Sequence, residues 1–542
     1  MLTRHTQKIL IIILLAAALI RGLYLWELQS NPMVNFIAEA PNFDQHNFLN
    51  LAQEIRTKGW LGESFAGFSP TYGYFLAAGL TLLNDNISGI FILQMIFGLF
   101  TVFLFYKSAT ILFENKTIGI IAAALAAFYA PAIFYEGTAL RASLLYGLNL
   151  CSFYLLLIAI KKMSLKYYLF TGFVVGLSVI LRPNLLPAFV FILLMFLPAI
   201  KFKQRISILI LFILGLTLAI APISLRNKAI GKDVLIAKPG PTIFWLGNTH
   251  DTAGIGLTLT ETQEELALES GHDPIKTLQI LLREIKTYPK KYQALYFRKF
   301  TMLFNTYEIP GNISYDMHWQ HSTALKLAGV QFGIIAPLAL LGFILLLPRW
   351  REMAPLYVYF LGLLFFVFLF HIQSRYRMPI VPFFILFAAY ALHSIGIFLK
   401  ENQLKQGLIA SLLLIMFVWF TKIDQQIIKT HFAQRINYVV YSNWSFAYAH
   451  MFKLKKETGE VDLEIMQKAL KMRHISIGLT PDAKTKDTLM IDMCSLYLGL
   501  KEYDTALKYY RYLHHKYPES RYIADTTLGL EKFLREVPPE LR

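Results

Sequence analysis

Residues 8–26 read KILIIILLAAALIRGLYLW, and this nearly unbroken apolar stretch decides the fold class. As a helix it is long enough to cross the roughly 30 Å of hydrocarbon in a bilayer. It is longer than the apolar core of a secretion signal and lacks a clear small-x-small cleavage site, so we interpret it as a membrane anchor. Further runs of the same kind follow along the chain and predict an all-α, polytopic transmembrane helix bundle.

We predict about 11–13 membrane spans, of which eleven are distinct apolar runs of about 16–28 residues. Their expected positions are 8–26, 86–106, 118–135, 143–160, 167–182, 184–200, 206–225, 325–347, 354–370, 379–399 and 407–423. A shorter apolar segment, 70–83, fits a re-entrant piece or a surface helix. The composition agrees, because 56% of the 542 residues are hydrophobic and only 16% are charged, against about 25% charged in a soluble protein.

The basic residues set the expected orientation. The formal net charge of +17 fits a membrane protein better than a nucleic-acid-binding one, because Lys and Arg accumulate in cytoplasmic loops. With the N-terminus inside, every short inside loop is basic, and the long loops 27–85 and 226–324 lie outside. An odd number of spans puts the C-terminal region outside as well. We therefore expect a transmembrane domain over 1–423, a soluble outer-face helical domain over 424–542, and no nucleic-acid partner.

Near 487–520 the spacing of small and aromatic residues matches a tetratricopeptide repeat, in which two antiparallel helices interlock and a proline ends the second. The matching residues are Tyr497, Tyr503, Ala506, Tyr510 and Pro518. Because one repeat cannot bury its own faces, we expect degenerate helical repeats beside it, at about 440–485 and 522–536. The alternative is a plain helical hairpin. Either interpretation makes this region a docking or covering module, which could bind a protein partner.

Five charged residues fall at the ends of predicted spans, and the topology count puts all of them on the outer side. They are Asp44, Glu136, Arg182, Arg375 and Arg377. A charge at a span end without an obvious structural need usually marks a functional site. Five on one face indicate a reaction centre at the membrane surface rather than a pore through the bilayer.

Asp44 begins a segment in which apolar residues recur at helical spacing, so we expect an amphipathic helix at the bilayer interface. The recurring residues are Phe48, Leu51, Ala52 and Ile55. The Asp44 carboxylate could accept a proton from an acceptor hydroxyl, or it could be only an acid at a helix N-terminus. Glu136 follows the third span, where it either pairs with Arg141 or faces the same site.

The arginines suggest an anion at the outer surface. Pro183 is expected to end a span and to hold Arg182 there, where its partner could be a ligand or a lipid phosphate. Arg375 and Arg377 flank Tyr376 in a basic turn, and guanidinium groups match the geometry of phosphate oxygens. Topology or lipid anchoring is the alternative explanation for this pair.

Several motifs are absent from the sequence. It has no Walker A phosphate loop, which disfavours ATP-driven transport, and no His-Glu-x-x-His, Cys-x-x-Cys or Gly-x-Ser-x-Gly pattern. The histidines lack metal-ligand spacing, although His46 and His371 lie near the predicted site. The two cysteines, Cys151 and Cys494, are far apart and imply neither a disulfide nor a metal knuckle. We expect no metal and no cofactor.

In this order and on this shared face, the candidate residues resemble the polytopic GT-C glycosyltransferases, in particular the bacterial family related to protein O-mannosyltransferases and to the aminoarabinose transferase of lipid A. The resemblance covers about residues 8–400. It is carried by Asp44 with Phe48 and Ala52, Gly59-Trp60, Phe68-Ser-Pro-Thr-Tyr-Gly-Tyr, Tyr135-Glu136, Arg182-Pro183, Phe244-Trp-Leu-Gly-Asn-Thr, Lys299 to Glu308 with Asn305, and Arg375-Tyr376-Arg377-Met-Pro. Such proteins are sometimes followed by a tetratricopeptide region.

The resemblance implies a donor sugar linked to polyprenyl phosphate and inversion at its anomeric carbon. It implies that Asp44 acts as base or hydrogen-bond acceptor. The phosphate leaving group would be held by Arg182, Arg375 and Arg377, with Glu136, Tyr376 and His46 in supporting positions. Some relatives carry a second acid directly after the first, where this chain has Gln45, and this departure argues against a metal site.

The combined prediction is a glycosyltransferase of the bacterial cytoplasmic (inner) membrane, with its active site and C-terminal domain on the periplasmic side. It would transfer a hexosyl or pentosyl group to a lipid, glycan or protein hydroxyl. The alternatives are a flippase or transporter of a lipid-linked glycan, a non-catalytic envelope scaffold, and a glycan ligase or polymerase of another fold. Charges at span ends, with the long loops all on one side, disfavour transport.

Overall fold

The structure is a computed structural model that describes most of the chain. The described residues are 4–37, 43–62, 69–196, 202–237, 241–256, 260–271, 273–311, 313–432, 434–480, 486, 489–490, 492–494, 496–497, 500 and 502–516. All regular elements in these ranges are helices, which confirms the predicted all-α fold. The chain forms two compact units, a transmembrane unit (Met1–Gln29 with Pro41–Lys429) and a C-terminal unit (Ser30–Ala40 with Thr430–Arg542).

Seven helices in the described residues are long and apolar enough to cross a membrane. They are α1 (Arg4–Gln29), α5 (Ile87–Phe113), α8 (Ala142–Lys162), α11 (Phe202–Ala229), α18 (Phe332–Leu346, continued by the 3-10 turn η3, Leu347–Arg349), α21 (Val381–Lys400) and α22 (Leu404–Phe420). Four shorter apolar helices accompany them, namely α6 (Lys116–Ala127), α9 (Leu165–Leu181), α10 (Leu186–Phe196, after the 3-10 turn η1, Pro183–Leu185) and α19 (Ala354–Phe368). Each of the eleven predicted spans overlaps one of these helices, which confirms the polytopic bundle.

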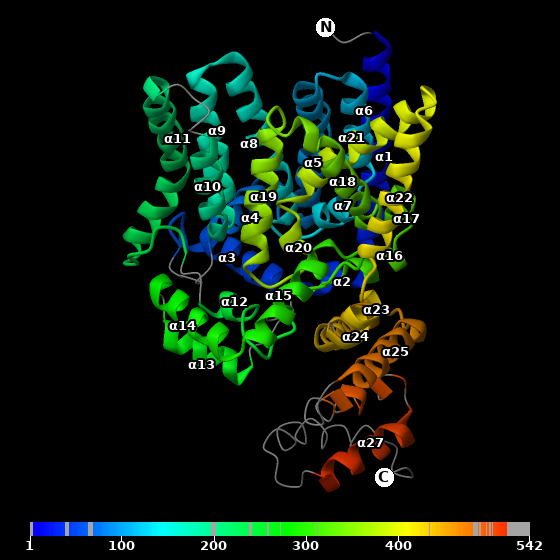
Figure 1. The fold of residues 1–542 in the computed structure, drawn as a ribbon. Helices are drawn as coiled ribbons and strands as arrows, with labels where there is room; N and C mark the ends of the chain where they lie inside the picture. The colour runs from blue at the N-terminus through cyan, green and yellow to red at the C-terminus, as the bar shows by residue number, and fades with distance from the viewer. Residues whose placement is uncertain are drawn as a thin grey trace. The chain divides into compact units, whose positions relative to one another are not determined.

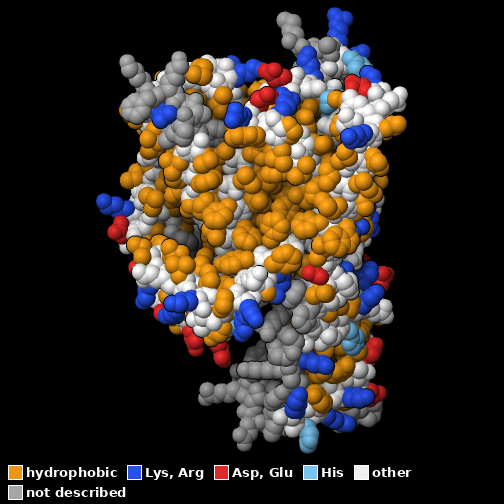
Figure 2. All heavy atoms as spheres, in the orientation of Figure 1, with side chains coloured by type: hydrophobic (Ala, Val, Ile, Leu, Met, Phe, Trp, Pro, Cys, Tyr) orange, Lys and Arg blue, Asp and Glu red, His pale blue; other side chains and the backbone are white. Residues whose placement is uncertain are grey.

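The surface of the transmembrane unit matches a lipid environment. Figure 2 shows a broad band of hydrophobic side chains across one face of this unit, with Lys and Arg side chains gathered at both of its ends. Exposed apolar residues of the outermost helices include Ile12, Leu15 and Leu19 on α1 and Leu408, Leu412 and Ile415 on α22. Soluble proteins rarely expose an apolar surface of this extent, whereas lipid tails are as apolar as these side chains.

The remaining helices of the transmembrane unit are short, and most of them lie outside the predicted spans. They are α3 (Asp44–Lys58), α4 (Thr71–Leu82), α7 (Ala130–Glu136), α12 (Pro241–Trp245), α13 (Glu261–Ser270), α14 (Pro274–Thr287), α15 (Pro289–Phe304), α16 (Tyr315–His321), α17 (Thr323–Ala328), α20 (Ser374–Arg377), α23 (Gln425–Ile427) and the π-helical turn η4 (Ile428–Phe432). In Figure 1, α3 and α12 to α15 lie at the end of the bundle away from the N-terminus. The two long predicted loops therefore meet at one end of this unit.

Two predicted spans, 118–135 and 325–347, are each broken into two helices, α6 with α7 and α17 with α18. The two breaks meet in the bundle. The amide of Val330 donates to the carbonyl of Phe128 (3.2 Å), and the amide of Ala130 donates to the carbonyl of Val330 (2.9 Å). Lipid offers no hydrogen bonds to an opened backbone, so each break supplies the partner that the other one needs.

Helix α3 is amphipathic, as predicted, and its apolar face packs inside the protein. Its buried residues include Phe48, Leu51, Ala52 and Ile55. Phe48 packs edge-on against Tyr72 of α4, with 5.0 Å between ring centroids. The segment 70–83 forms α4, which covers this apolar face, so the face packs against protein rather than lipid. This packing fixes the first turn of α3, where Asp44 lies. The position of α3 at the bilayer interface stays a prediction.

Helices α9 and α11 pack with their backbones unusually close. A Cβ atom added to Gly172 of α9 or to Gly215 of α11 would collide with a backbone carbonyl of the other helix. Small residues allow this approach between membrane helices. Helix α9 ends just before Arg182, as Pro183 predicts, and Arg182 has an extended backbone (φ −143°, ψ 90°). The tight helix pair thus holds one of the candidate arginines at a fixed turn.

The C-terminal unit contains α2 (Pro32–Ile37), α24 (Gln434–Glu457), α25 (Leu463–Leu479) and α27 (Tyr503–Lys516). Its predicted boundary at 423/424 lies close to the observed division after Lys429, and the sequence did not predict that 30–40 joins it. One apolar core contains Met493, Tyr497, Ala506 and Leu507, with Tyr503 and Tyr510 packed against it. Pro518 lies outside the described residues, so the tetratricopeptide repeat stays a prediction.

Candidate active site

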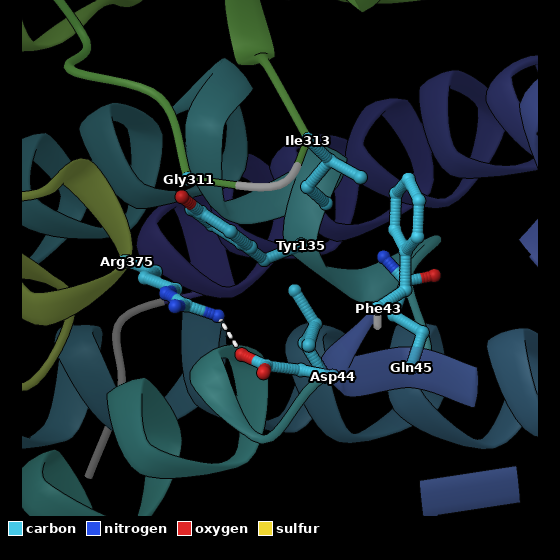
Figure 3. Close-up of a pocket in the computed structure, with 8 residues that line it drawn as sticks. Phe43, Asp44, Gln45, Tyr135, Gly311, Ile313 and Arg375 are labelled. Atoms are coloured by element: carbon cyan, nitrogen blue, oxygen red, sulfur yellow. Dashed lines mark hydrogen bonds and ion pairs between the residues drawn. The ribbon is translucent and has the colours of Figure 1, made fainter. Parts of the chain in front are cut away.

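A small pocket opens beside the first turn of α3 (Figure 3). Its walls come from four separate parts of the transmembrane unit. The residues that form them are Phe43, Asp44 and Gln45 at the start of α3, Tyr135 of α7 with Leu140 after it, Gly311 and Ile313 before α16, and Arg375 of α20. Figure 3 shows the Asp44 carboxylate pointing toward the Arg375 guanidinium across the pocket. Two of the residues predicted from widely separated sequence positions therefore meet in one place.

Asp44 and Arg375 form an ion pair between Oδ2 and Nη1. The side chain of Asp44 is 43% exposed and that of Arg375 is 17% exposed, so the pair remains accessible. Burial alone would raise the pKa of Asp44, but the charge and hydrogen bond of Arg375, followed by the charges of Arg141 and Arg182, lower it below the ordinary value. Asp44 is consequently a carboxylate at neutral pH, surrounded by cations.

Helix α20 is held in place by contacts to distant loops. The amide of Ser374 donates to the carbonyl of Ile309 (2.9 Å), and the Ser374 hydroxyl is hydrogen-bonded to the Tyr135 hydroxyl (2.7 Å). Gln373 accepts a hydrogen bond from Nε of Arg375 (2.9 Å). The Arg375 guanidinium is therefore aimed at the pocket by groups that are themselves anchored, as a binding residue requires.

Arg182 lies next to this pair. Its guanidinium carbon is 4.0 Å from the centroid of the Tyr376 ring, a stacked cation–π contact. The side chain is 5% exposed, and its Nη1 atom is buried without a hydrogen-bond partner in the described part of the chain. Nearby, Arg141 donates to the carbonyl of Leu181 (2.8 Å). A buried guanidinium with an unused donor is costly unless an anion completes it.

Arg377 is used differently from Arg375. It forms an ion pair with Glu308 (2.7 Å), in which both side chains are almost fully buried. It also donates to the carbonyls of Leu303 (3.2 Å) and Asn305 (2.8 Å), and its guanidinium stacks on the Phe332 ring at 3.5 Å. These contacts of Arg377 connect α20 to the end of α15 and to α18. Arg377 does not line the pocket.

The comparisons with known proteins bear on this site. Residues 68–225 match the family model described as dolichyl-phosphate-mannose-protein mannosyltransferase. The chain is similar to this family over that stretch, which is less than a third of its 542 residues. A comparison with curated proteins found no match. The matched region runs from before α4 through most of α11, so it contains Glu136 and Arg182 but not Asp44, Arg375 or Arg377.

Inside the region that matches the mannosyltransferase family, Glu136 forms a buried ion pair with Arg21 of α1. Nε and Nη2 of Arg21 donate to the two carboxylate oxygens, at 2.7 and 2.9 Å. The side chains are 2% and 3% exposed respectively. Glu136 therefore pairs with neither Arg141 nor the pocket in this structure. The sequence analysis missed Arg21, although an arginine inside the first apolar run was a visible signal.

The supporting residues have different surroundings. The Tyr376 ring contacts both the Arg182 guanidinium and the His371 ring, whose centroid is 4.4 Å away. Burial, followed by the charge of Arg375, lowers the pKa of His371 to about 3, so this imidazole is neutral at physiological pH. His46 is hydrogen-bonded to Asn50 one turn along α3 (2.7 Å) and does not line the pocket. Within the described ranges, no three His, Cys, Asp or Glu side chains cluster as a metal site would need.

Proposed function

We propose that this protein transfers a sugar from a polyprenyl-phosphate-linked donor to an acceptor hydroxyl, with inversion at the anomeric carbon, on the extracytoplasmic side of the membrane. The observation that carries the proposal is the ion pair of Asp44 and Arg375 at a pocket, with the incompletely paired Arg182 beside it. The family description matched by residues 68–225 names a polyprenyl-phosphate-linked mannose as donor, which supports this donor class.

The arginines supply the phosphate site. Asp44 interacts electrostatically with Arg375, Arg141 and Arg182, so three cations surround one carboxylate. A phosphodiester carries one negative charge and oxygens that accept paired N–H groups from guanidinium. The unused Nη1 of Arg182 and the accessible face of Arg375 are the donors that such a phosphate would engage.

Donor binding would also prepare Asp44. In the structure described here Asp44 is neutralised by Arg375, and a carboxylate held by a guanidinium is a weak base. A donor phosphate competes for the same guanidinium. As Arg375 turns to the phosphate, the Asp44 carboxylate becomes available to an acceptor hydroxyl. The order of events is then donor first, acceptor second.

The reaction is a single displacement. The acceptor oxygen attacks C1 of the sugar, its proton passes to Asp44, and the bond from C1 to the phosphate oxygen breaks, so that polyprenyl phosphate leaves with the electron pair. Among the described residues of the pocket wall, Asp44 carries the one carboxylate. Without a second carboxylate to form a glycosyl intermediate, attack from the opposite face and inversion are favoured. Catalysis then rests on orientation and on charge neutralisation of the phosphate.

Purified protein in nanodiscs, supplied with radiolabelled polyprenyl-phosphate sugars, tests the proposal directly. We expect Arg182→Met to raise the KM for the donor by roughly 10- to 100-fold, since a hydrogen bond to a charged group is lost. Arg182→Lys should recover little of the loss, because an ammonium cannot reproduce the fork or the stacking on Tyr376.

Arg226→Met is the matched control for this prediction. Arg226 is as buried as Arg182, at 5% exposure each, and lies at the end of α11, where its guanidinium contacts Leu61 and Asn227. The KM of the Arg226→Met variant for the donor should stay within about twofold of the wild-type value. An unchanged donor KM in Arg182→Met would remove Arg182 from the phosphate site, and no transfer from any donor by wild type would refute the proposed function.

A further inference from the structure

We propose that the site accepts an uncharged sugar and discriminates against a cationic amino sugar, with Gln45 as the residue that contacts the sugar hydroxyls. This inference rests on the proposed function and goes beyond it, because it names the chemical class of the sugar. Two independent observations carry it. One is that the buried Gln45 amide has no hydrogen-bond partner in the described part of the chain. The other is that positive charges outnumber negative charges around the pocket.

Gln45 lines the pocket directly beside Asp44 (Figure 3). Its side chain is 2% exposed, and both amide atoms, Nε2 and Oε1, are buried with no hydrogen-bond partner in the described part of the chain. A buried amide that satisfies none of its hydrogen bonds is unfavourable. It is typical of a group whose partner is a ligand.

The chemistry of the amide indicates which ligand group fits. A primary amide offers two N–H donors and one carbonyl acceptor and carries no charge. Neighbouring hydroxyls of a sugar ring both donate and accept, so they can satisfy both ends of the amide at once. An ammonium group donates only, and it would leave the Nε2 donors of Gln45 without a partner.

The surrounding charges also oppose a cationic sugar. Arg375, Arg141 and Arg182 all act on Asp44, which is the one carboxylate among the described residues of the pocket wall. A bound donor phosphate brings one negative charge, so the three arginines still outnumber the two negative charges of Asp44 and the phosphate. Glu308, a buried carboxylate of the same unit, is paired with Arg377. A sugar ammonium would therefore meet net positive charge at short range, where repulsion is strong.

The experiment compares two donors that share one isoprenoid chain, polyprenyl-phosphate mannose and polyprenyl-phosphate aminoarabinose. Wild-type protein should use the neutral donor with a kcat/KM at least about 10-fold higher. Gln45→Leu should lower kcat/KM for the neutral donor by about 10-fold or more, because the hydroxyl contacts are lost. Gln45→Glu should move the preference toward the amino sugar by at least about 10-fold, because it adds a second carboxylate.

Gln53→Glu is the matched control, since it makes the same charge change on the exposed side of the same helix. It should leave the donor preference unchanged. Thermal unfolding of each variant in detergent shows whether it is folded. If Gln45→Leu does not fold, Gln45→Asn provides a smaller change. The wild-type preference tests the inference even if every variant at this position is unstable.

The outcomes separate the two proposals. Transfer from the amino sugar that equals or exceeds transfer from the neutral one overturns this inference and leaves the proposed function standing. If wild type transfers no sugar from these or any other polyprenyl-phosphate donor, the proposed function fails. In that case competition binding of the two donors decides the inference, and equal or tighter binding of the amino sugar overturns it. If Gln53→Glu changed the donor preference as much as Gln45→Glu, the change would be a general effect of charge. That result would also overturn the role of Gln45.

Discussion

Asp44→Asn is expected to lower sugar transfer by roughly 100- to 10,000-fold while the protein stays folded. Asparagine keeps the size of the side chain and can still accept a hydrogen bond from Arg375, but it cannot take the proton of an acceptor hydroxyl. The Asp44 side chain is 43% exposed, so little stability depends on it. The measurement is transfer at saturating donor, with thermal unfolding in detergent as the test of folding.

Asp85→Asn is the matched control for this prediction. Asp85 also forms an ion pair with an arginine, Arg56, in the first long loop, but its side chain is 69% exposed. Asp85→Asn should transfer sugar at nearly the wild-type rate.

The pH dependence of the Asp44→Asn rate is a second measurement. Because the pKa of Asp44 lies below its ordinary value, the carboxylate is ionised between about pH 5 and 8, so the ratio of mutant to wild-type rate should be constant there. Full activity of Asp44→Asn would refute the proposed mechanism.

Much of the fold could be predicted from the sequence because membrane spans are defined by length and hydropathy. The helix end before Arg182 followed from Pro183 in the same way, since proline removes a helical hydrogen bond. The two broken spans were harder. Hydropathy stays high across Phe128–Tyr129 and across Gly329, which has a positive φ of 73°. The hydrogen bonds that join the two breaks come from segments far apart in the chain, so hydropathy alone could not predict them.

The pairing of charges could be predicted only in part. The sequence indicated that Asp44 and the arginines share one face, and the structure brings Asp44, Arg375 and Arg182 together. Which acid neutralises which arginine depends on packing between loops far apart in the chain. Hence the pairs of Glu136 with Arg21 and of Arg377 with Glu308 had no counterpart in spacing or composition.

The two arginines of the basic turn, Arg375 and Arg377, looked equivalent in the sequence and are expected to behave differently when replaced. Arg377→Met should cost about 3–5 kcal/mol of stability, because it leaves the buried Glu308 carboxylate without its partner. It also frees the backbone carbonyls of Leu303 and Asn305. Thermal unfolding in detergent, or loss of expressed protein, measures this effect.

Arg349→Met is the control, since Arg349 pairs with Glu352 at a surface where the two side chains are 47% and 62% exposed. Exposed pairs contribute about 0–1 kcal/mol, so its unfolding temperature should barely change. The double variant Arg377→Met with Glu308→Leu should recover most of the loss, because two apolar side chains of similar volume then fill the site.

The same variants separate a structural role of Arg377 from the predicted role in holding the donor phosphate. If Arg377 acts by positioning α20, the stable double variant should bind the donor nearly as well as wild type, since Arg375 and Arg182 remain in place. A double variant that is stable but has a donor KM raised as much as in Arg182→Met would show that Arg377 reaches the phosphate. In that case Glu308 would hold Arg377 only until the donor arrives, as Asp44 is proposed to hold Arg375.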